Sequence, residues 1–144
     1  MKESDAPIDL CLPELIIDFL VAERGRGSGK PYAVQALGIQ AQPLRFVGLL
    51  SDDTLVLNSN GMDLVLPHPI NFALQKLIIS NRRKTKEKQA KDRLQAAEVL
   101  REIIRGGEAA KARAKYASLP VGWRKAVSQS LQAMGAEDIQ AALG

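Results

Sequence analysis

The spacing of hydrophobic and polar residues separates a strand-forming first half of the chain from a helix-forming second half. Residues 14–22 form a short apolar run rich in strand-forming side chains, with one carboxylate, Asp18, inside it. Such a run predicts a buried strand. Residues 32–40 are weakly patterned and fit a short strand or an extended segment. The first half therefore predicts sheet structure around an embedded acidic residue.

A hairpin and a helix start are predicted between residues 43 and 66. Two apolar runs, 54–58 and 62–66, flank Ser59-Asn60-Gly61, and an Asn-Gly pair between such runs indicates a β-hairpin. Proline is favoured at the first position of a helix. Pro43, with the apolar residues of 44–50 behind it, therefore predicts a helix that begins there.

The second half shows the three- and four-residue spacing of amphipathic helices. A first helix is expected over 70–80 and a second over 84–105, which Gly106-Gly107 ends. The apolar stripe of the second helix consists of Ala90, Leu94, Ala97, Leu100 and Ile104. Shorter helices are expected over 108–116, 121–134 and 136–143.

Strands followed by helices favour an α+β fold. The expected division is a sheet-containing region over 1–66 and a helical region over 67–144, together forming one compact unit. The length of 144 residues suffices for a sizeable core.

Charge is distributed unevenly along the chain. The formal net charge is +4, but residues 76–115 carry thirteen basic and five acidic side chains, a net charge of +8. A block this basic attracts phosphate on a nucleotide or a nucleic acid. The alternative is a solvated helix face on which lysine is simply a good helix former.

Several protein classes are excluded by composition. The single cysteine, Cys11, allows no intramolecular disulfide and no zinc site of several cysteines. No apolar run reaches the length of a membrane-spanning helix, and the acidic residues 1–9 do not form a signal peptide. We therefore expect a cytoplasmic protein with no membrane partner.

Asp18 is the first candidate for chemistry. A carboxylate flanked by six apolar residues is rarely buried unless a positive group meets it. Near a strand end it could coordinate Mg²⁺, which prefers oxygen ligands. The alternative is an aspartate that is salt-bridged or faces a sheet edge.

A basic constellation is the second candidate. Two adjacent helices could direct Lys76, Arg82 or Arg83, and Lys91 toward one phosphate-bearing ligand, with Asp92 holding a lysine in place. Cations that clamp a triphosphate recur in phosphoryl and nucleotidyl transfer. The alternative is favourable electrostatics at a helix C-terminus and i,i+4 pairs such as Lys88–Asp92.

Seven sequence blocks carry a family resemblance that covers about residues 14–105. They are Ile-Ile-Asp-Phe-Leu at 16–20, Ala-Leu-Gly at 36–38, Ala-Gln-Pro-Leu-Arg-Phe at 41–46, Leu-Pro-His-Pro at 66–69, Phe-Ala-Leu-Gln-Lys-Leu-Ile at 72–78, Arg82-Arg83, and Lys-Asp-Arg-Leu-Gln-Ala at 91–96. In their order and spacing the chain resembles a bacterial branch of the polymerase-β-like nucleotidyltransferase superfamily. The lysine, arginine and Lys-Asp elements are also similar to those of abortive-infection toxin nucleotidyltransferases.

The resemblance implies a small mixed sheet with helices, followed by a helical C-terminal region. It also implies binding of a nucleoside triphosphate with Mg²⁺ and transfer of a nucleotidyl group to an acceptor hydroxyl. Asp18 matches the third metal-binding carboxylate of the family. Lys76, Lys91 and Asp92 match the nucleotide-side elements, and Arg82 and Arg83 join them as nucleotide-binding candidates.

The chain departs from the family pattern before Asp18. The seventeen residues that precede it contain neither a Gly-Ser turn nor a pair of carboxylates at the family spacing. Gln75 also stands where relatives tend to carry histidine. Two-metal catalysis needs a cluster that holds both ions about 4 Å apart. We therefore expect the C-terminal portion of a nucleotidyltransferase, inactive alone.

Two other functions remain open on the sequence. A nucleic-acid-binding module could use the phosphate-directed basic block 76–115, although no aromatic residue lies within it to stack on a base. A non-catalytic interaction protein could use an exposed apolar sheet edge to form a homodimer or to bind a completing partner chain.

Overall fold

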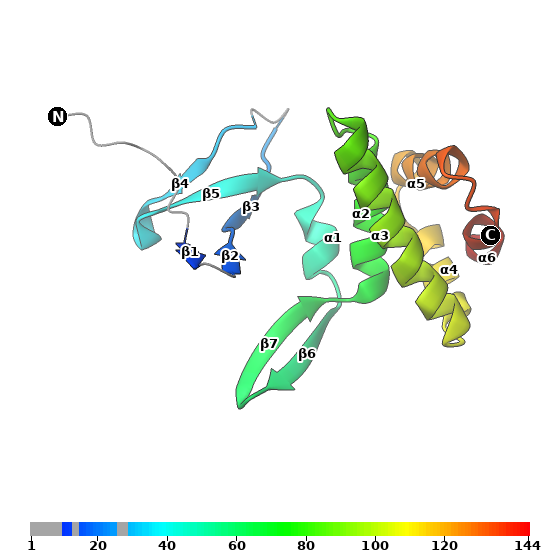
Figure 1. Ribbon diagram of the computed structural model, residues 1–144, viewed down its shortest axis with the longest axis horizontal. Helices are drawn as coiled ribbons and strands as arrows, with labels where there is room; N and C mark the ends of the chain where they lie inside the picture. Colours follow the sequence, from blue (N-terminus) through cyan, green and yellow to red (C-terminus); the bar gives the residue numbers. More distant parts are fainter. Residues whose placement is uncertain (1–9, 13–14, 26–28) are drawn as a thin grey trace. The chain divides into compact units, whose positions relative to one another are not determined.

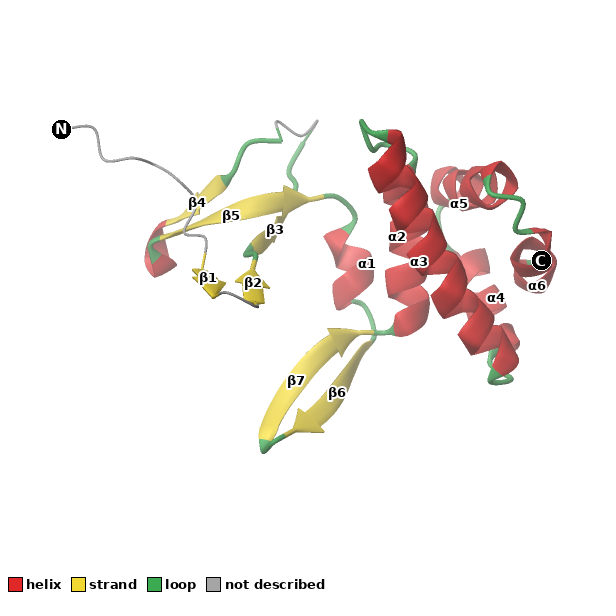
Figure 2. Cartoon of the chain, in the orientation of Figure 1, coloured by secondary structure: helices red, strands yellow, loops and turns green. Residues whose placement is uncertain are grey.

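The computed structural model describes residues 10–12, 15–25 and 29–144, and it divides the chain into two compact units. The first unit covers Met1–Gly48 and the second Leu49–Gly144. Figure 1 labels their strands and helices. The predicted hairpin belongs to the second unit, whereas the sequence-based division at residue 66 assigned it to the first. The α+β class is confirmed (Figure 2).

The first unit is built from short strands. β1 (Leu10–Leu12) pairs antiparallel with β2 (Leu15–Ile17). A second sheet has the order β3-β5-β4, in which β5 (Ile39–Leu44) is parallel to β3 (Leu20–Ala22) and antiparallel to β4 (Tyr32–Val34). A 3₁₀ turn over Gln35–Leu37 joins β4 to β5. The sheet is therefore mixed, as the family resemblance implies.

The prediction of one buried strand over 14–22 is wrong. β2 ends at Ile17 and β3 begins at Leu20, so Asp18 lies in the break between two three-residue strands. Leu20 is 53% exposed, and Asp18 is exposed as well. Burying an unpaired carboxylate is costly, and Asp18 remains exposed to solvent.

The prediction that Pro43 begins a helix is also wrong. Pro43 lies in β5 opposite Val21 of β3, and α1 (Val47–Ser51) begins four residues later. The neighbouring Gln42 donates its N–H to Phe19 O of the β3 side at 2.7 Å, so the nitrogen of residue 43 faces the β4 side. Pairing with β4 stops at Ala41. Because no strand needs a donor from position 43, the missing N–H of proline costs nothing there.

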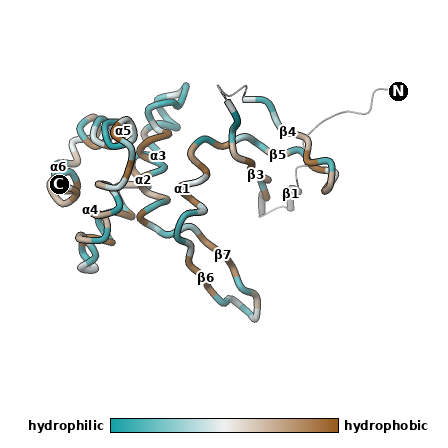
Figure 3. Tube along the Cα trace, turned by 180° about the vertical axis from the view of Figure 1, so that it is seen from behind, coloured by the Kyte–Doolittle hydropathy of each residue, from teal (hydrophilic) through white to brown (hydrophobic). Residues whose placement is uncertain are grey.

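The predicted hairpin is confirmed. β6 (Thr54–Ser59) pairs antiparallel with β7 (Met62–Pro67) in full register, from Thr54↔Pro67 to Ser59↔Met62. Asn60 and Gly61 both have positive φ, 52° and 78°, as the tightest hairpin turn requires. Figure 3 shows hydrophobic residues along both strands. The cross-strand pairs Leu55↔Leu66 and Leu57↔Leu64 give one face four leucines, each at least 39% exposed.

Five helices form the rest of the second unit. They are α2 (Pro69–Ser80), α3 (Lys86–Arg105), α4 (Ala109–Ser118), α5 (Val121–Ala133) and α6 (Glu137–Leu143), close to the predicted helices. His68 caps α2, because its Nδ1 accepts the Ile70 N–H at 3.2 Å while Pro69 occupies the first turn. The core gathers fully buried side chains from all five of these helices, among them Leu74, Leu100, Ala112, Leu131 and Ile139.

The predicted apolar stripe of α3 is correct only in its second half. Ala97 and Leu100 are fully buried, but Leu94 is 55% exposed and Ala90 is exposed. In the first half of the helix, the buried position is that of Asp92. This face carries polar side chains that bond to α2, and Asp92 lies one and two helical turns before the buried Ala96 and Leu100. Among the described helices, none combines the length and the hydropathy needed to cross a bilayer.

Candidate functional site

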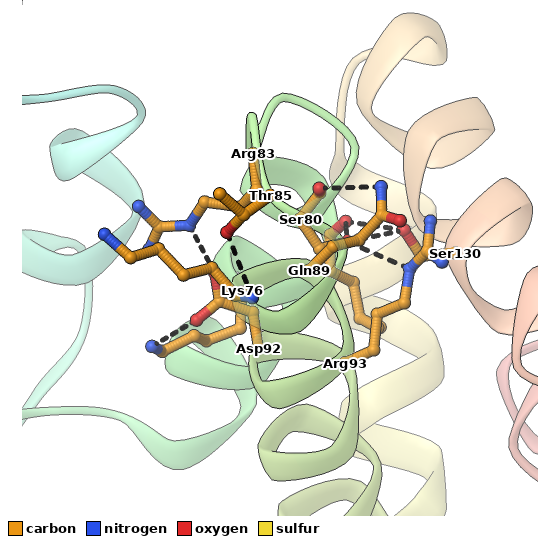
Figure 4. Close-up of polar contacts among 10 residues, drawn as sticks. Lys76, Ser80, Arg83, Thr85, Gln89, Asp92, Arg93 and Ser130 are labelled. Atoms are coloured by element: carbon orange, nitrogen blue, oxygen red, sulfur yellow. Dashed lines mark hydrogen bonds and ion pairs between the residues drawn. The ribbon is translucent and has the colours of Figure 1, made fainter.

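The candidate site lies where the end of α2 packs against the beginning of α3. A short connection over residues 81–85 joins the two helices, and Thr85 caps α3 by accepting the Lys88 N–H at 3.4 Å. Figure 4 shows two groups of polar side chains at this junction. One contains Lys76, Arg83 and Asp92, which we name the Asp92 cluster.

In the Asp92 cluster, one carboxylate holds two cations. Lys76 Nζ donates to Asp92 Oδ1 at 2.8 Å, and Arg83 Nε donates to Asp92 Oδ2 at 2.5 Å. The Asp92 side chain is only 6% exposed, whereas those of Lys76 and Arg83 are 20% and 38% exposed. Charge-assisted hydrogen bonds on both oxygens compensate the carboxylate for its burial. The cluster keeps its acidic member inside and its basic members at the surface.

Lys76 is held in place by a second contact. Its Nζ lies 5.6 Å from the centre of the Phe72 ring, one helical turn earlier on α2. A cation at this distance over an aromatic face is attracted to it. The ring and the Asp92 carboxylate together fix the ammonium group, so Lys76 is preorganised at the protein surface.

The electrostatics of the cluster are reflected in the pKa of Asp92, which lies below its ordinary value of 3.8. Burial acts to raise this pKa, but the hydrogen bonds from Arg83 and Lys76 and their positive charges outweigh it. Since the folded pKa is depressed, ionised Asp92 stabilises the fold above about pH 4, and this contribution is lost as the pH falls through the folded pKa.

The lowered pKa of Asp92 predicts how the stability of the protein depends on pH. The free energy of unfolding of the wild-type protein is expected to fall as the pH is lowered from about 5 to 3, more steeply than that of Asp92→Asn, which cannot titrate at this position. Urea unfolding at each pH measures both curves. Parallel curves for the two proteins would contradict the role assigned to ionised Asp92.

The remaining sequence candidates lie beside the cluster rather than in it. Arg82 and Lys91 are both exposed, and Lys91 makes no ion pair with any described residue. Each is adjacent in sequence to a cluster member, Arg82 to Arg83 and Lys91 to Asp92. Of the five nucleotide-binding candidates, the structure brings Lys76, Arg83 and Asp92 into direct contact and leaves Arg82 and Lys91 as exposed cations.

A second polar group at the junction was missed by the sequence analysis. Ser80 and Ser130 of α5 approach to 2.9 Å, and each hydroxyl lies 2.8 Å from Leu77 O near the end of α2. Gln89 Nε2 donates to Ser80 O at 3.2 Å, and Arg93 donates to Asn81 Oδ1 at 2.9 Å. These bonds satisfy carbonyl groups of the last turn of α2. Gln89 and Arg93, polar residues spaced by four on α3, were the sequence pattern that could have predicted this second polar group.

Asp18 belongs to the first unit, and the Asp92 cluster belongs to the second. Among the residues that the structure describes, no group of three or more histidine, cysteine, aspartate or glutamate side chains is placed to hold a metal ion. Asp18 is thus a single exposed carboxylate, and one carboxylate does not make the oxygen-rich site that Mg²⁺ needs. These residues do not by themselves form a magnesium site.

The Asp92 cluster and its neighbours can bind a polyanion. Lys76, Arg83 and the exposed Lys91 carry three positive charges against the single negative charge of Asp92. Lys76 gives one of its three N–H groups to Asp92 and Arg83 gives its Nε–H, so both retain further donors. An excess of positive charge with free donors is the chemistry that recognises phosphate.

Comparisons with known proteins agree with this chemistry. A sequence model of a family described as nucleotidyltransferase matches residues 12–117, which include Asp18 and every member of the Asp92 cluster. No curated protein and no solved structure matches the chain.

Proposed function

The chain belongs to the nucleotidyltransferase family, and we propose on that basis that its Asp92 cluster binds the phosphates of a nucleoside triphosphate during nucleotidyl transfer. The observation that carries the proposal is the pairing of buried Asp92 with both Lys76 and Arg83. The pairing fixes two surface cations in one place before any ligand arrives. Preorganised charge of this kind stabilises charge that develops in a reaction.

The proposed roles follow from the reaction. In nucleotidyl transfer, an acceptor hydroxyl attacks the α-phosphorus, the bond from that phosphorus to its bridging oxygen breaks, and pyrophosphate leaves. Lys76 and Arg83 neutralise the charge on phosphate oxygens, with Arg82 and Lys91 as additional cations. Asp92 does not touch the nucleotide in this proposal but positions the two cations that do.

We propose Mg²⁺ as the cofactor that the family resemblance implies, with Asp18 as one carboxylate ligand. Because Asp18 is the one residue that matches a metal-binding carboxylate of the family, this chain alone is expected to bind a triphosphate weakly.

Titration calorimetry with ATP, GTP, CTP and UTP tests the phosphate site. Lys76→Met removes the ammonium group while it keeps the aliphatic chain, and the dissociation constant of a bound triphosphate is expected to rise about tenfold, the cost of one charge-assisted hydrogen bond. Lys111→Met is the matched control, because Lys111 is an exposed α4 lysine paired with Glu108 at 3.2 Å.

Two results would contradict the proposal. One is an affinity in Lys76→Met equal to that of the wild-type protein. The other is an equal loss in Lys111→Met, which would indicate nonspecific attraction to a basic surface. Thermal unfolding of each variant establishes that the fold is retained, so that a loss of affinity reports on the site.

A second candidate function, self-association, is favoured by the hairpin. The face formed by Leu55, Leu57, Leu64 and Leu66 is uncharged and exposed, and a two-stranded ribbon rarely stands alone in water. We propose a second copy of the chain, whose hairpin presents the same four leucines, as the occupant of this face. Sedimentation equilibrium is expected to show a dimer that Leu57→Lys disrupts. A strictly monomeric wild-type protein at about 100 μM would exclude it, since micromolar affinities are ordinary for interfaces of moderate size.

A further inference from the structure

A groove along α5 combines two unpaired cations with several hydrogen-bond donors. Its lining residues are spaced by three and four positions on α5 and therefore share one face of the helix. The groove has a volume of about 500 Å³, and it is lined by Tyr116 of α4 and by Val121, Arg124, Lys125, Ser128, Gln129 and Gln132 of α5. We name it the α5 groove. None of the Asp92 cluster residues lines it.

The α5 groove is positively charged. Arg124 and Lys125 line it and no acidic side chain does. Within the described residues, neither cation forms an ion pair, whereas Lys76, Arg83 and Arg101 each pair with an aspartate. No acidic group in the described part of the chain therefore neutralises Arg124 or Lys125 through an ion pair, and their charge can attract an anion.

Arg124 lacks a hydrogen-bond acceptor that it needs. Its Nε is buried and makes no hydrogen bond with any described residue, while its backbone carbonyl accepts the Tyr116 hydroxyl at 3.3 Å. An unsatisfied buried N–H costs free energy, and more so on a charged group. In the two-pronged geometry that arginine favours, Nε–H and a terminal N–H bind an oxyanion together.

Uncharged donors extend along the same face of α5. Gln140 Nε2 donates to Ser128 Oγ at 3.1 Å, which leaves the Ser128 hydroxyl proton free to donate into the groove. The side-chain amides of Gln129 and Gln132 follow on the same face. From Val121 to Gln132 the helix rises about 16 Å at 1.5 Å per residue, enough for more than one phosphate of a polynucleotide strand.

We propose that the α5 groove binds phosphate groups, with Arg124 and Lys125 as the charged contacts and the Ser128, Gln129 and Gln132 side chains as further donors. The phosphate comes either from a single-stranded oligonucleotide or from free phosphate. Tyr116 and the glutamine amides favour the oligonucleotide, because an aromatic ring and amide groups can contact bases while the cations contact the backbone.

The Nε–H resonance of Arg124 in nuclear magnetic resonance spectra is the direct probe. It is expected to shift and to exchange more slowly with solvent on addition of a ten-nucleotide single strand, or of inorganic phosphate. If the oligonucleotide is the source, the side-chain amide signals of Gln129 and Gln132 shift as well; if free phosphate is the source, only the arginine signal moves. No shift with either ligand overturns the proposal.

Affinity measurements on matched variants provide the second test. Arg124→Gln/Lys125→Gln is expected to raise the dissociation constant of the ligand identified by resonance at least tenfold. For the oligonucleotide, the slope of log affinity against log salt concentration is expected to fall by the amount that about two phosphate contacts contribute. Lys84→Gln/Lys86→Gln removes the same charge from exposed lysines outside the groove. Equal losses in both variants would overturn the proposal. Because the Asp92 cluster is intact in all of them, the outcome is separate from that of the triphosphate experiment.

Discussion

Replacement of Asp92 by alanine is expected to lower the free energy of unfolding by about 2 kcal/mol. The carboxylate is 6% exposed and accepts hydrogen bonds from both Lys76 and Arg83. Its removal leaves two like charges close together without the group between them. Breaking a fully buried pair costs more, but Arg83 is 38% exposed and water screens part of its charge. Urea unfolding at pH 7 measures the change.

Asp138→Ala is the matched control for this experiment. Asp138 also pairs with an arginine, Arg101 Nε at 2.8 Å, but the two side chains are 57% and 41% exposed. Arg101 donates two hydrogen bonds to this exposed carboxylate, and Asp138 lies in the first turn of α6. Exposed ion pairs still contribute little to stability, so a smaller loss than that of Asp92→Ala is expected. Equal destabilisation by the two substitutions would contradict the distinction between a buried cluster and a surface ion pair.

Leu100→Ala is expected to destabilise the protein by about 3 kcal/mol, whereas Leu94→Ala changes stability by less than about 0.5 kcal/mol. Both leucines lie on α3 and both belong to the apolar stripe predicted from the sequence. Leu100 is fully buried, so its truncation leaves a cavity in the core, but Leu94 is 55% exposed. Thermal and urea unfolding of the two variants measure this difference directly. Similar losses would contradict the rotation of α3 described here.

The sequence correctly predicted those helices and strands whose backbone conformation depends on neighbouring residues. Asn60-Gly61 supplies the two positive φ values of the hairpin turn, and residues 68–69 fix the start of α2 through a side-chain cap and a proline. The three- and four-residue spacing likewise located the helices of the second unit. For these elements, a few neighbouring residues determine the backbone.

The wrong predictions have tertiary causes. Pro43 is accommodated in β5 because β4 ends before it, which only the strand pairing shows. Leu94 is exposed because α3 packs through the face of Ala96 and Leu100. The same face turns Asp92 toward Lys76 and Arg83, nine or more residues away. The spacing of hydrophobic residues alone does not predict an ion pair between residues this far apart in the sequence.

The sequence predicted which residues belong to the candidate site, but not the distances between them or their burial. The basic pattern and the family resemblance both selected Lys76 and Asp92, with Asp92 expected to hold a lysine. The structure identifies this lysine as Lys76 and adds the burial of the carboxylate. The hydroxyl pair of Ser80 and Ser130 joins residues 50 positions apart. No spacing rule relates such residues, so the network that holds the end of α2 emerges only from the packing of α2 against α5.

The most direct test of the central claim follows individual cation resonances of the wild-type chain during titration with a nucleoside triphosphate. If the Asp92 cluster is the phosphate site, the Lys76 Nζ and Arg83 Nε signals shift together and saturably, while those of Lys111 and Arg101, paired elsewhere on the surface, remain in place. Equal shifts of all four signals, or saturable shifts at Lys111 and Arg101 alone, would contradict the account.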